Sequence, residues 1–193
     1  MNGKHNKHLI LFNAMKLHYF FIIFLLINTL LFSAIAQAKG TYQQPEEFVS
    51  EAFSQKTPEP DIIWIKDELR QTIESILQHK YKSKRIRYWK QKQRSVWVLE
   101  EVGKKKPITV GIIIDNDKIS QLKVLVFRET RGWEVRYPFF TKQFNQLFLV
   151  NKNELSDSVD GVSGATLSVR ALTKLARIAL LLNQHTVLTE SIK

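Results

Sequence analysis

Cysteine is absent from the 193 residues of this chain, and its absence excludes disulfide bonds, thiol catalysis and zinc–thiolate sites. Histidine is scarce beyond residue 38, where only His79 and His185 remain; they lie far apart, and neither is assigned a catalytic role. No Gly-x-Gly-x-x-Gly fingerprint occurs, which argues against direct oxidation of NAD(P)H. Internal repeats and low-complexity segments are also missing. The length allows one ordinary domain with a sizeable core, plus extra segments.

The first 38 residues resemble an export signal. Three lysines precede an apolar run over about 19–32, and the small-x-small sequence at 36–38 suits a cleavage site. The run is short for a spanning helix. We therefore expect a signal peptide over 1–38 and a periplasmic protein; an uncleaved inner-membrane anchor is the alternative. Met15 is a second candidate for the start of the chain.

Lysine and arginine outnumber aspartate and glutamate by 29 to 18. The first 38 residues hold three of the lysines and no acid, so the rest of the chain keeps 26 basic against 18 acidic side chains. Such an excess suits nucleic acid, an anionic membrane surface or an acidic protein. The basic runs at 80–87 and 104–106 carry no nucleic-acid motif, and solvated faces and turns explain them more simply. We expect no nucleic-acid partner, and a membrane surface stays open.

Hydrophobic periodicity predicts helices around a run of strands. A short helix is expected from Pro45 to about 53, followed by a loop over 54–60. Apolar residues at helical spacing predict an amphipathic helix over 61–79. Alternating or β-branched runs predict antiparallel strands, with a tight Asn/Asp turn at 115–117. These strands are expected at 85–88, 95–102, 108–114 and 118–128.

The segments after the strands are less regular. The aromatic-rich stretch 137–150 is expected to be helical or irregular and to close the core beneath a bound cofactor. Residues 151–158 are polar and predict a loop, and the tail beyond Asn183 is expected to fray.

The most informative stretch is 160–168, which reads Asp-Gly-Val-Ser-Gly-Ala-Thr-Leu-Ser. It directly precedes an apolar pattern that predicts a helix over 169–182. Its two glycines permit backbone shapes that other residues resist. A helix N-terminus has unpaired N–H groups and a positive dipole end, which favour a phosphate. The plain alternative is a turn whose serine or threonine only caps the helix.

Residues 160–166 resemble the flavinylation motif of the FMN-binding domain family, which includes flavoprotein subunits of the sodium-pumping NADH:quinone reductase and the ferredoxin-linked respiratory complex. The family pattern (Asp, small, any, Ser/Thr, Gly, Ala, Thr/Ser) is filled in order. The resemblance implies FMN joined to Thr166 by a phosphoester. A separate flavin transferase, with Mg²⁺ at its own site, would install it. The other implied cofactor-binding residues of the motif are Asp160, Gly161, Ser163, Gly164 and Ala165.

The negative charge of Asp160 would repel a phosphodiester, so we do not expect its carboxylate to contact the phosphate. Instead, Asp160 is expected to hold the loop by hydrogen bonds or to be recognised by the transferase. A weaker similarity covers 129–132, Glu-Thr-Arg-Gly, where family members often have Glu-Thr-Pro-Gly at a flavin-side loop. It implies Glu129 and Thr130 as cofactor-binding residues, and the arginine in place of proline leaves the loop shape open.

Three neighbouring side chains have two readings each. Trp133 offers a flat surface for the isoalloxazine ring, or is a half-buried loop residue. Arg128 and Arg131 suit ribityl or phosphate oxygens, or are simply exposed.

Together these patterns predict an α+β fold, a twisted antiparallel sheet with helices packed on it, like an FMN-binding domain. We expect a helical extension over 39–80, the FMN-binding domain over 81–185 and a tail over 186–193. The main hypothesis is an exported electron carrier between a membrane-bound reductase and an extracytoplasmic acceptor, rather than a stand-alone enzyme. A flavin-dependent reductase of a small substrate or metal ion is one alternative. A non-redox periplasmic interaction module is another.

Overall fold

The computed structural model describes residues 16, 40–151 and 153–190. The apolar run at 19–32 and the predicted cleavage site lie outside these residues. The chain divides into two units, residues 1–38 and 39–193, and all the strands described belong to the second. Within the described ranges, no helix combines the length and the apolar character needed to cross a bilayer.

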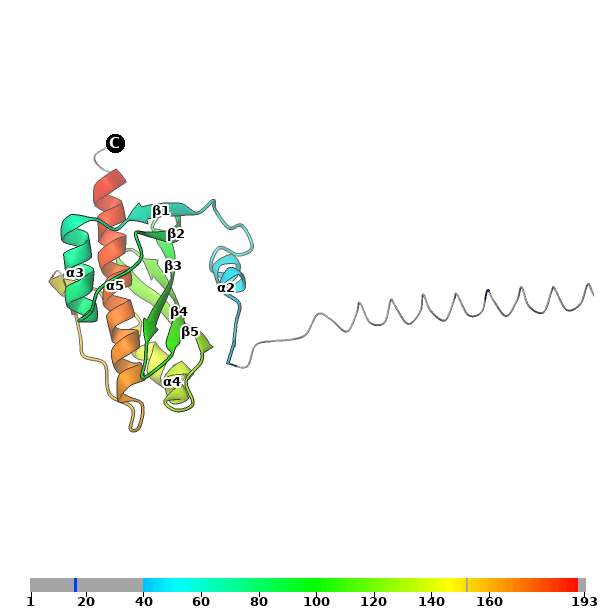
Figure 1. The fold of residues 1–193 in the computed structure, drawn as a ribbon. Helices are drawn as coiled ribbons and strands as arrows, with labels where there is room; N and C mark the ends of the chain where they lie inside the picture. The colour runs from blue at the N-terminus through cyan, green and yellow to red at the C-terminus, as the bar shows by residue number, and fades with distance from the viewer. Residues whose placement is uncertain (1–15, 17–39, 152, 191–193) are drawn as a thin grey trace, which may run out of the picture. The chain divides into compact units, whose positions relative to one another are not determined.

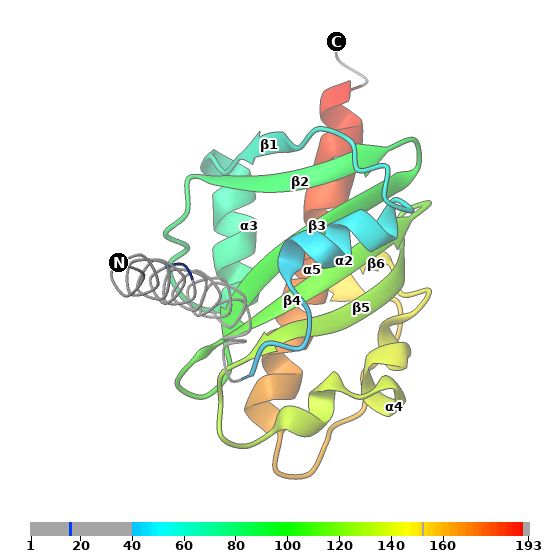
Figure 2. The ribbon, with the colours of Figure 1, turned by 90° about the vertical axis from the view of Figure 1, so that its right-hand side faces the viewer.

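A five-stranded sheet lies at the centre of the second unit, with its strands in chain order and every neighbouring pair antiparallel (Figure 2). The predicted meander is confirmed. Residues Asn116 and Asp117 make the β4–β5 turn with φ of 50° and 62°, the left-handed region that Asn and Asp tolerate. The strands are β1 (Asp61–Trp64), β2 (Arg85–Gln91), β3 (Arg94–Val102), β4 (Pro107–Asp115) and β5 (Lys118–Phe127).

The predicted helix over 61–79 is wrong in its first part. Residues 61–64 form β1, which pairs with β2 from Asp61↔Tyr88 to Trp64↔Arg85. The helix α3 (Asp67–Leu77) begins only after Lys66, whose backbone is extended. The two isoleucines and the tryptophan of β1 favour a strand once a partner is present. The segment 39–80 therefore supplies a strand to the sheet as well as helices.

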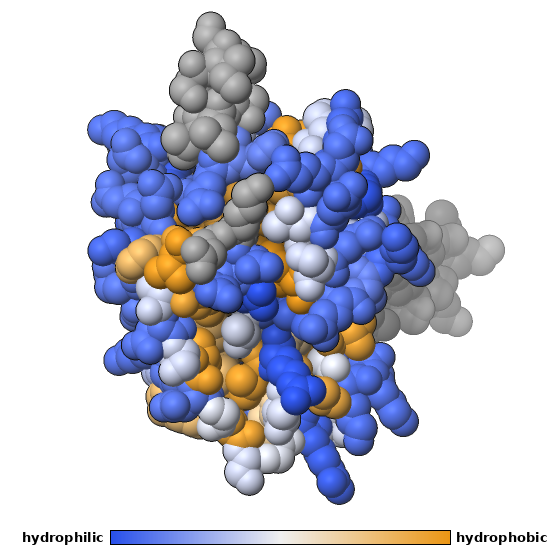
Figure 3. All heavy atoms as spheres, turned by 90° about the vertical axis from the view of Figure 1, so that its left-hand side faces the viewer, coloured by the Kyte–Doolittle hydropathy of each residue, from blue (hydrophilic) through white to orange (hydrophobic). Residues whose placement is uncertain are grey.

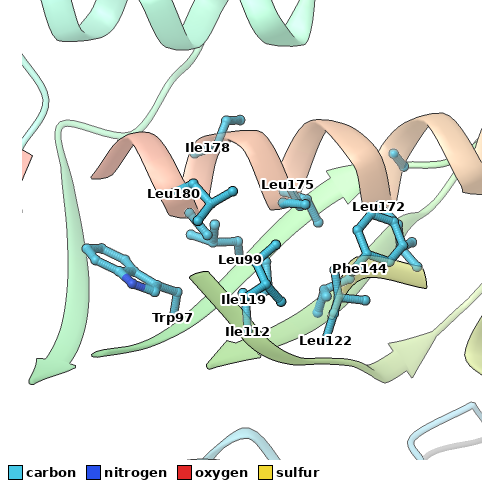
Figure 4. Packing of buried hydrophobic residues seen from close by; sticks show 14 of the residues in the cluster. Trp97, Leu99, Ile112, Ile119, Leu122, Phe144, Leu172, Leu175, Ile178 and Leu180 are labelled. Carbon is cyan, nitrogen blue, oxygen red and sulfur yellow. The ribbon is translucent and has the colours of Figure 1, made fainter. Parts of the chain in front are cut away.

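Helices cover both faces of the sheet (Figure 1). On one face, α2 (Pro45–Ala52) packs Phe48 and Val49 against residues of β3, β4 and β5. On the other, α3 and the long helix α5 (Thr166–Glu190) enclose the larger core. Figure 4 shows α5 residues such as Leu172 and Leu175 lying over Ile119 and Leu122 of β5. The interior strand β4 is buried along most of its length because both of its faces are covered.

The segment after β5 contains short helical turns, as predicted: η1 (Trp133–Arg136), α4 (Pro138–Thr141) and η2 (Lys142–Phe144). The rings of Phe140 and Phe144 meet edge to face at 5.6 Å and close one end of the core. Two predictions nearby are wrong. The strand β7 (Glu154–Leu155) lies in the predicted loop, and it pairs with β6 (Leu149–Asn151), most of which lies in the stretch expected to be helical or irregular. The helix α5 continues to Glu190 instead of fraying after Asn183, and Thr186 is buried.

Candidate functional site

Thr166 is the first residue of α5, so its hydroxyl lies at the N-terminus of a 25-residue helix. The preceding loop turns into the helix through a hydrogen bond from the Ala165 amide to the Val162 carbonyl, 2.9 Å long. Gly164 takes a left-handed conformation there, with φ of 79°. Ala165 is buried while Thr166 is exposed. The buried Ala165 therefore anchors the loop to the core, and Thr166 is exposed to solvent at the positive end of the helix dipole.

A pocket of about 400 Å³ lies at this helix end, where three segments of the chain meet. The turn between β3 and β4 contributes Lys104 and Lys105, and the loop after β5 contributes residues 129–131. The start of α5 contributes residues 164–168, including Thr166. The volume lies within the range of small-molecule and cofactor sites. The structure thus brings the two separate motifs of the sequence together around one cavity.

The loop after β5 packs against α5 at Gly132. A Cβ built on Gly132 would lie 2.8 Å from the Ser168 hydroxyl oxygen and 3.4 Å from the Ala165 Cα. The backbone at Gly132 is also left-handed, with φ of 80°. The left-handed backbone favours glycine at this position, and any side chain would also have to displace the Ser168 hydroxyl. This contact fixes the distance between the 129–132 loop and the flavinylation-like motif.

Glu129 holds the β3–β4 turn. Its Oε1 atom accepts hydrogen bonds from the backbone amides of Lys104 at 2.8 Å and Lys106 at 2.7 Å, and a third from Lys105. Partial burial acts to raise the pKa of Glu129, but the bonds from Lys105, Lys106 and Lys104 outweigh it and lower that pKa. The carboxylate is thus held ionised, and it orders the turn that brings two lysines to the pocket.

The charges of the pocket suit a phosphate. Lys104, Lys105 and Arg131 supply three cationic side chains, and the helix terminus adds its partial positive charge. Glu129 is the acidic residue among the described lining side chains, and its Oε1 is engaged by the turn amides. These residues fit a flavin nucleotide whose phosphate lies near Thr166.

The other predicted site residues lie around the pocket but do not line it. Asp160, Gly161 and Ser163 are on the exposed loop before Gly164. The backbone amide of Asp160 donates to the side-chain oxygen of Gln143 at 2.8 Å. Its carboxylate has no hydrogen bond to the described residues, so it is accessible to another protein.

Trp133 is not among the residues that line the pocket. Its ring meets Tyr137 edge to face at 5.7 Å, and the Arg136 guanidinium lies 5.3 Å from its centre. Arg128 does not line the pocket either, and it donates to the carbonyl of Pro107 and the hydroxyl of Thr109 at 3.2 and 3.1 Å. Of the two arginines considered for the cofactor, only Arg131 lines the pocket.

Lys104 and Lys105 were missed as site residues, because the sequence shows them only as part of a basic turn. The sequence offers only an indirect indication. Glu129, which accepts hydrogen bonds from the turn amides, lies 25 and 24 residues after Lys104 and Lys105. Only the pairing of β4 with both β3 and β5 brings the β3–β4 turn and the loop after β5 to the same end of the sheet.

The antiparallel sheet, the long helix that begins at Thr166 and the pocket beside that residue form an α+β domain with a candidate phosphate site. Residues 103–181 match the family model of the FMN-binding domain, and this match supports FMN as the cofactor of this part of the chain. The match includes the lysine turn, the 129–132 loop and the motif at 160–166. The domain predicted from the sequence, 81–185, is wider than this match. Searches of curated proteins and of solved structures found no match to the chain.

Proposed function

We propose that this protein is an exported electron carrier whose FMN is joined through its phosphate to the Oγ1 of Thr166. The observation that carries the proposal is the exposed hydroxyl at the head of α5, on the wall of the pocket that Lys104, Lys105 and Arg131 also line. The family match supports the cofactor. The attachment, the export and the relay are the parts that need experiments.

A second enzyme would make the bond. Threonine is a weak nucleophile unless a base activates it. In the described part of the chain no histidine lines the pocket, and the Oε1 atom of Glu129 is engaged by backbone amides. In the proposed step the Thr166 oxygen bonds to the FMN phosphorus of FAD, and the pyrophosphate bond breaks. AMP leaves, and the hydroxyl proton passes to the transferase. The exposed loop with Asp160 would be the surface that the transferase reads.

Bound FMN supplies one- and two-electron redox chemistry. The residues of the chain hold it and set its surroundings. Lys104, Lys105 and Arg131 offset the negative charge of the phosphodiester. The close contact of Gly132 with α5 holds the 129–132 loop beside the helix. An exposed attachment point suits a carrier that meets a membrane-bound donor on one side and an extracytoplasmic acceptor on the other. The signal-like residues 1–38 support a periplasmic location, with an inner-membrane anchor if they are retained.

The attachment can be tested by co-expression with a flavin transferase. We expect the denatured protein band to fluoresce under ultraviolet light, and the intact mass to rise by FMN less one water. Thr166→Ala should lose both signals, and Thr166→Ser should keep them. Ser158→Ala removes an exposed hydroxyl outside the 160–166 motif and is the matched control, which should still carry FMN. A bare polypeptide, or label that persists in Thr166→Ala, would contradict the proposal.

The relay can be tested with the loaded protein. Membranes given NADH should reduce it in stopped-flow measurements, and protein acceptors should reoxidise it. If instead one small molecule or metal ion reoxidises it with saturation at low concentration, the protein is a flavin-dependent reductase. Export is checked by fractionating cells and adding protease from outside the inner membrane; a protected protein would contradict a periplasmic location.

A further inference from the structure

A second cavity runs along the outer face of α5. Its volume is about 660 Å³, and its walls come from α5, the end of α3 and the end of β3. Three basic side chains line it, Arg170, Lys174 and Arg177, spaced four and three residues apart and so on one face of the helix. No aspartate or glutamate is among its described lining residues. Figure 3, which looks at the side of the molecule where α3 and α5 lie, shows mostly hydrophilic side chains with apolar ones between them.

Two of the three cations are held in place by the protein. The Lys174 ammonium donates to the Leu77 carbonyl at 2.6 Å and lies 3.6 Å from the Glu101 carboxylate. That carboxylate is shared, because His79 also contacts it at 3.1 Å. The Arg177 Nε atom donates to the carbonyl of Asn153. Burial lowers the pKa of Arg177, an effect that the charge of Glu154 opposes. Both cations are thus fixed at the wall of the groove.

Arg170 differs from them. Its side chain is exposed, and it makes no hydrogen bond or ion pair with the residues that the structure describes. Its guanidinium therefore keeps all five N–H donors for a ligand, in the fork that matches a carboxylate or other oxyanion. A ligand that bridges Arg170 and the two fixed cations would need more than one negative charge.

The groove adjoins the pocket beside Thr166, which the proposed FMN would occupy and which we call the flavin pocket. Leu167 lines both cavities. Gly103, on the groove, is followed directly by Lys104, on the pocket. A ligand at this end of the groove would lie beside the first turn of α5, one residue from Thr166.

We propose that this groove binds a small polyanion, a di- or tricarboxylate or a divalent oxyanion, through Arg170 with Lys174 and Arg177. The volume and the concave form suit a small molecule, and charge-assisted hydrogen bonds from arginine supply the recognition. The site goes beyond the proposed function: it consists of protein side chains alone and needs no flavin.

Binding is best measured by titration calorimetry on the flavin-free Thr166→Ala protein at low salt, with citrate and sulfate as probes and acetate as the monovalent comparison. We expect saturable citrate binding that weakens as sodium chloride is added. Arg170→Gln should raise the Kd for citrate about tenfold, because a charge-assisted bond is lost. Arg87→Gln removes the same charge from β2, outside the groove, and should leave the Kd unchanged.

Three results would overturn the proposal: no saturable binding of citrate or sulfate, acetate binding as tight as citrate, or equal losses in Arg170→Gln and Arg87→Gln. Arg170 is exposed and unpaired, so its variant should unfold at the same urea concentration as the parent, and Arg170→Lys should fall between the two in affinity. Since the titration uses protein without FMN, failure of flavin attachment leaves this result intact, and failure here leaves the attachment intact.

Discussion

The Ser95 hydroxyl on β3 donates a 2.6 Å hydrogen bond to the amide oxygen of Asn183 on α5, between two buried side chains 88 residues apart. The nitrogen of the same amide donates to Asp117 in the β4–β5 turn at 2.7 Å. The Trp97 indole N–H in turn donates to the Ser95 oxygen at 2.8 Å. Asn183 therefore ties the distal half of α5 to the sheet at two points, while the flavin pocket lies at the opposite end of the helix.

Replacement of Asn183 by leucine should lower the free energy of unfolding by about 1–3 kcal/mol, because the buried Ser95 hydroxyl loses its acceptor and Asp117 loses its donor. Urea denaturation measures this. Gln184→Ala, at the exposed neighbouring position, should change it by less than about 0.5 kcal/mol. Flavin loading of the folded Asn183→Leu protein should match the parent. Equal unfolding curves for the two variants would show that the buried network does not stabilise the fold.

Gly132→Ala should both destabilise the protein and reduce FMN loading. The left-handed backbone costs about 1–2 kcal/mol for a residue with a Cβ, and the contact with Ser168 forces the loop away from α5. Gly161→Ala is the comparison for stability, since a Cβ there meets no atom within 4 Å. It should leave the urea midpoint nearly unchanged. A Gly132→Ala protein with the parent's midpoint and full loading would contradict the assigned contact.

The parts of the fold that the sequence predicted are those with strong local patterns. The meander from β2 to β5 alternates or is β-branched throughout, and its Asn/Asp turn has its own chemistry. The apolar face of α5 follows helical spacing without a break. β1 was misread because Ile62 and Ile65 happen to share that spacing with Leu69, and its strand state depends on pairing with residues 85–88. The length of α5 was misread because its distal anchor, Asn183, has its partners far away in the chain.

The candidate site, like the fold, was predictable only where its residues form a local pattern in the sequence. Thr166 and the glycines before it form a contiguous motif, so their place at the head of a helix followed from the sequence. The lysines of the β3–β4 turn could not be assigned, since their role depends on three strands meeting at one end of the sheet. Trp133 was considered for the ring because of its place in the chain, but its side chain joins Arg136 and Tyr137 instead.

Glu129 should make stability depend on acid pH. Its pKa is lowered in the folded protein, so its stabilising contribution is complete above the ordinary value of 4.5 and is lost as the pH falls through the lower folded value. Glu129→Gln should therefore be less stable than the parent near neutral pH, and the difference should shrink below about pH 4.5. Urea unfolding at a series of pH values gives the curve. A stability difference between the parent and Glu129→Gln that stays the same at every pH would show that the carboxylate does not hold the turn.

His79 should show the opposite pH dependence. Its pKa is raised above 6.5, first by the bond of its Nδ1 to the Lys80 carbonyl at 3.1 Å and next by the Glu101 carboxylate; partial burial and the Lys174 charge oppose the shift. A raised folded pKa gives a contribution that is complete below the ordinary value and is lost as the pH rises through the folded one. The stability difference between the parent and His79→Gln should therefore shrink from pH 6 to pH 9. An NMR titration of the His79 ring should give a midpoint above 6.5, and Glu101→Gln should lower it. A midpoint below 6.5, or one that Glu101→Gln leaves in place, would mean that His79 and Glu101 do not interact in solution as they do in the structure.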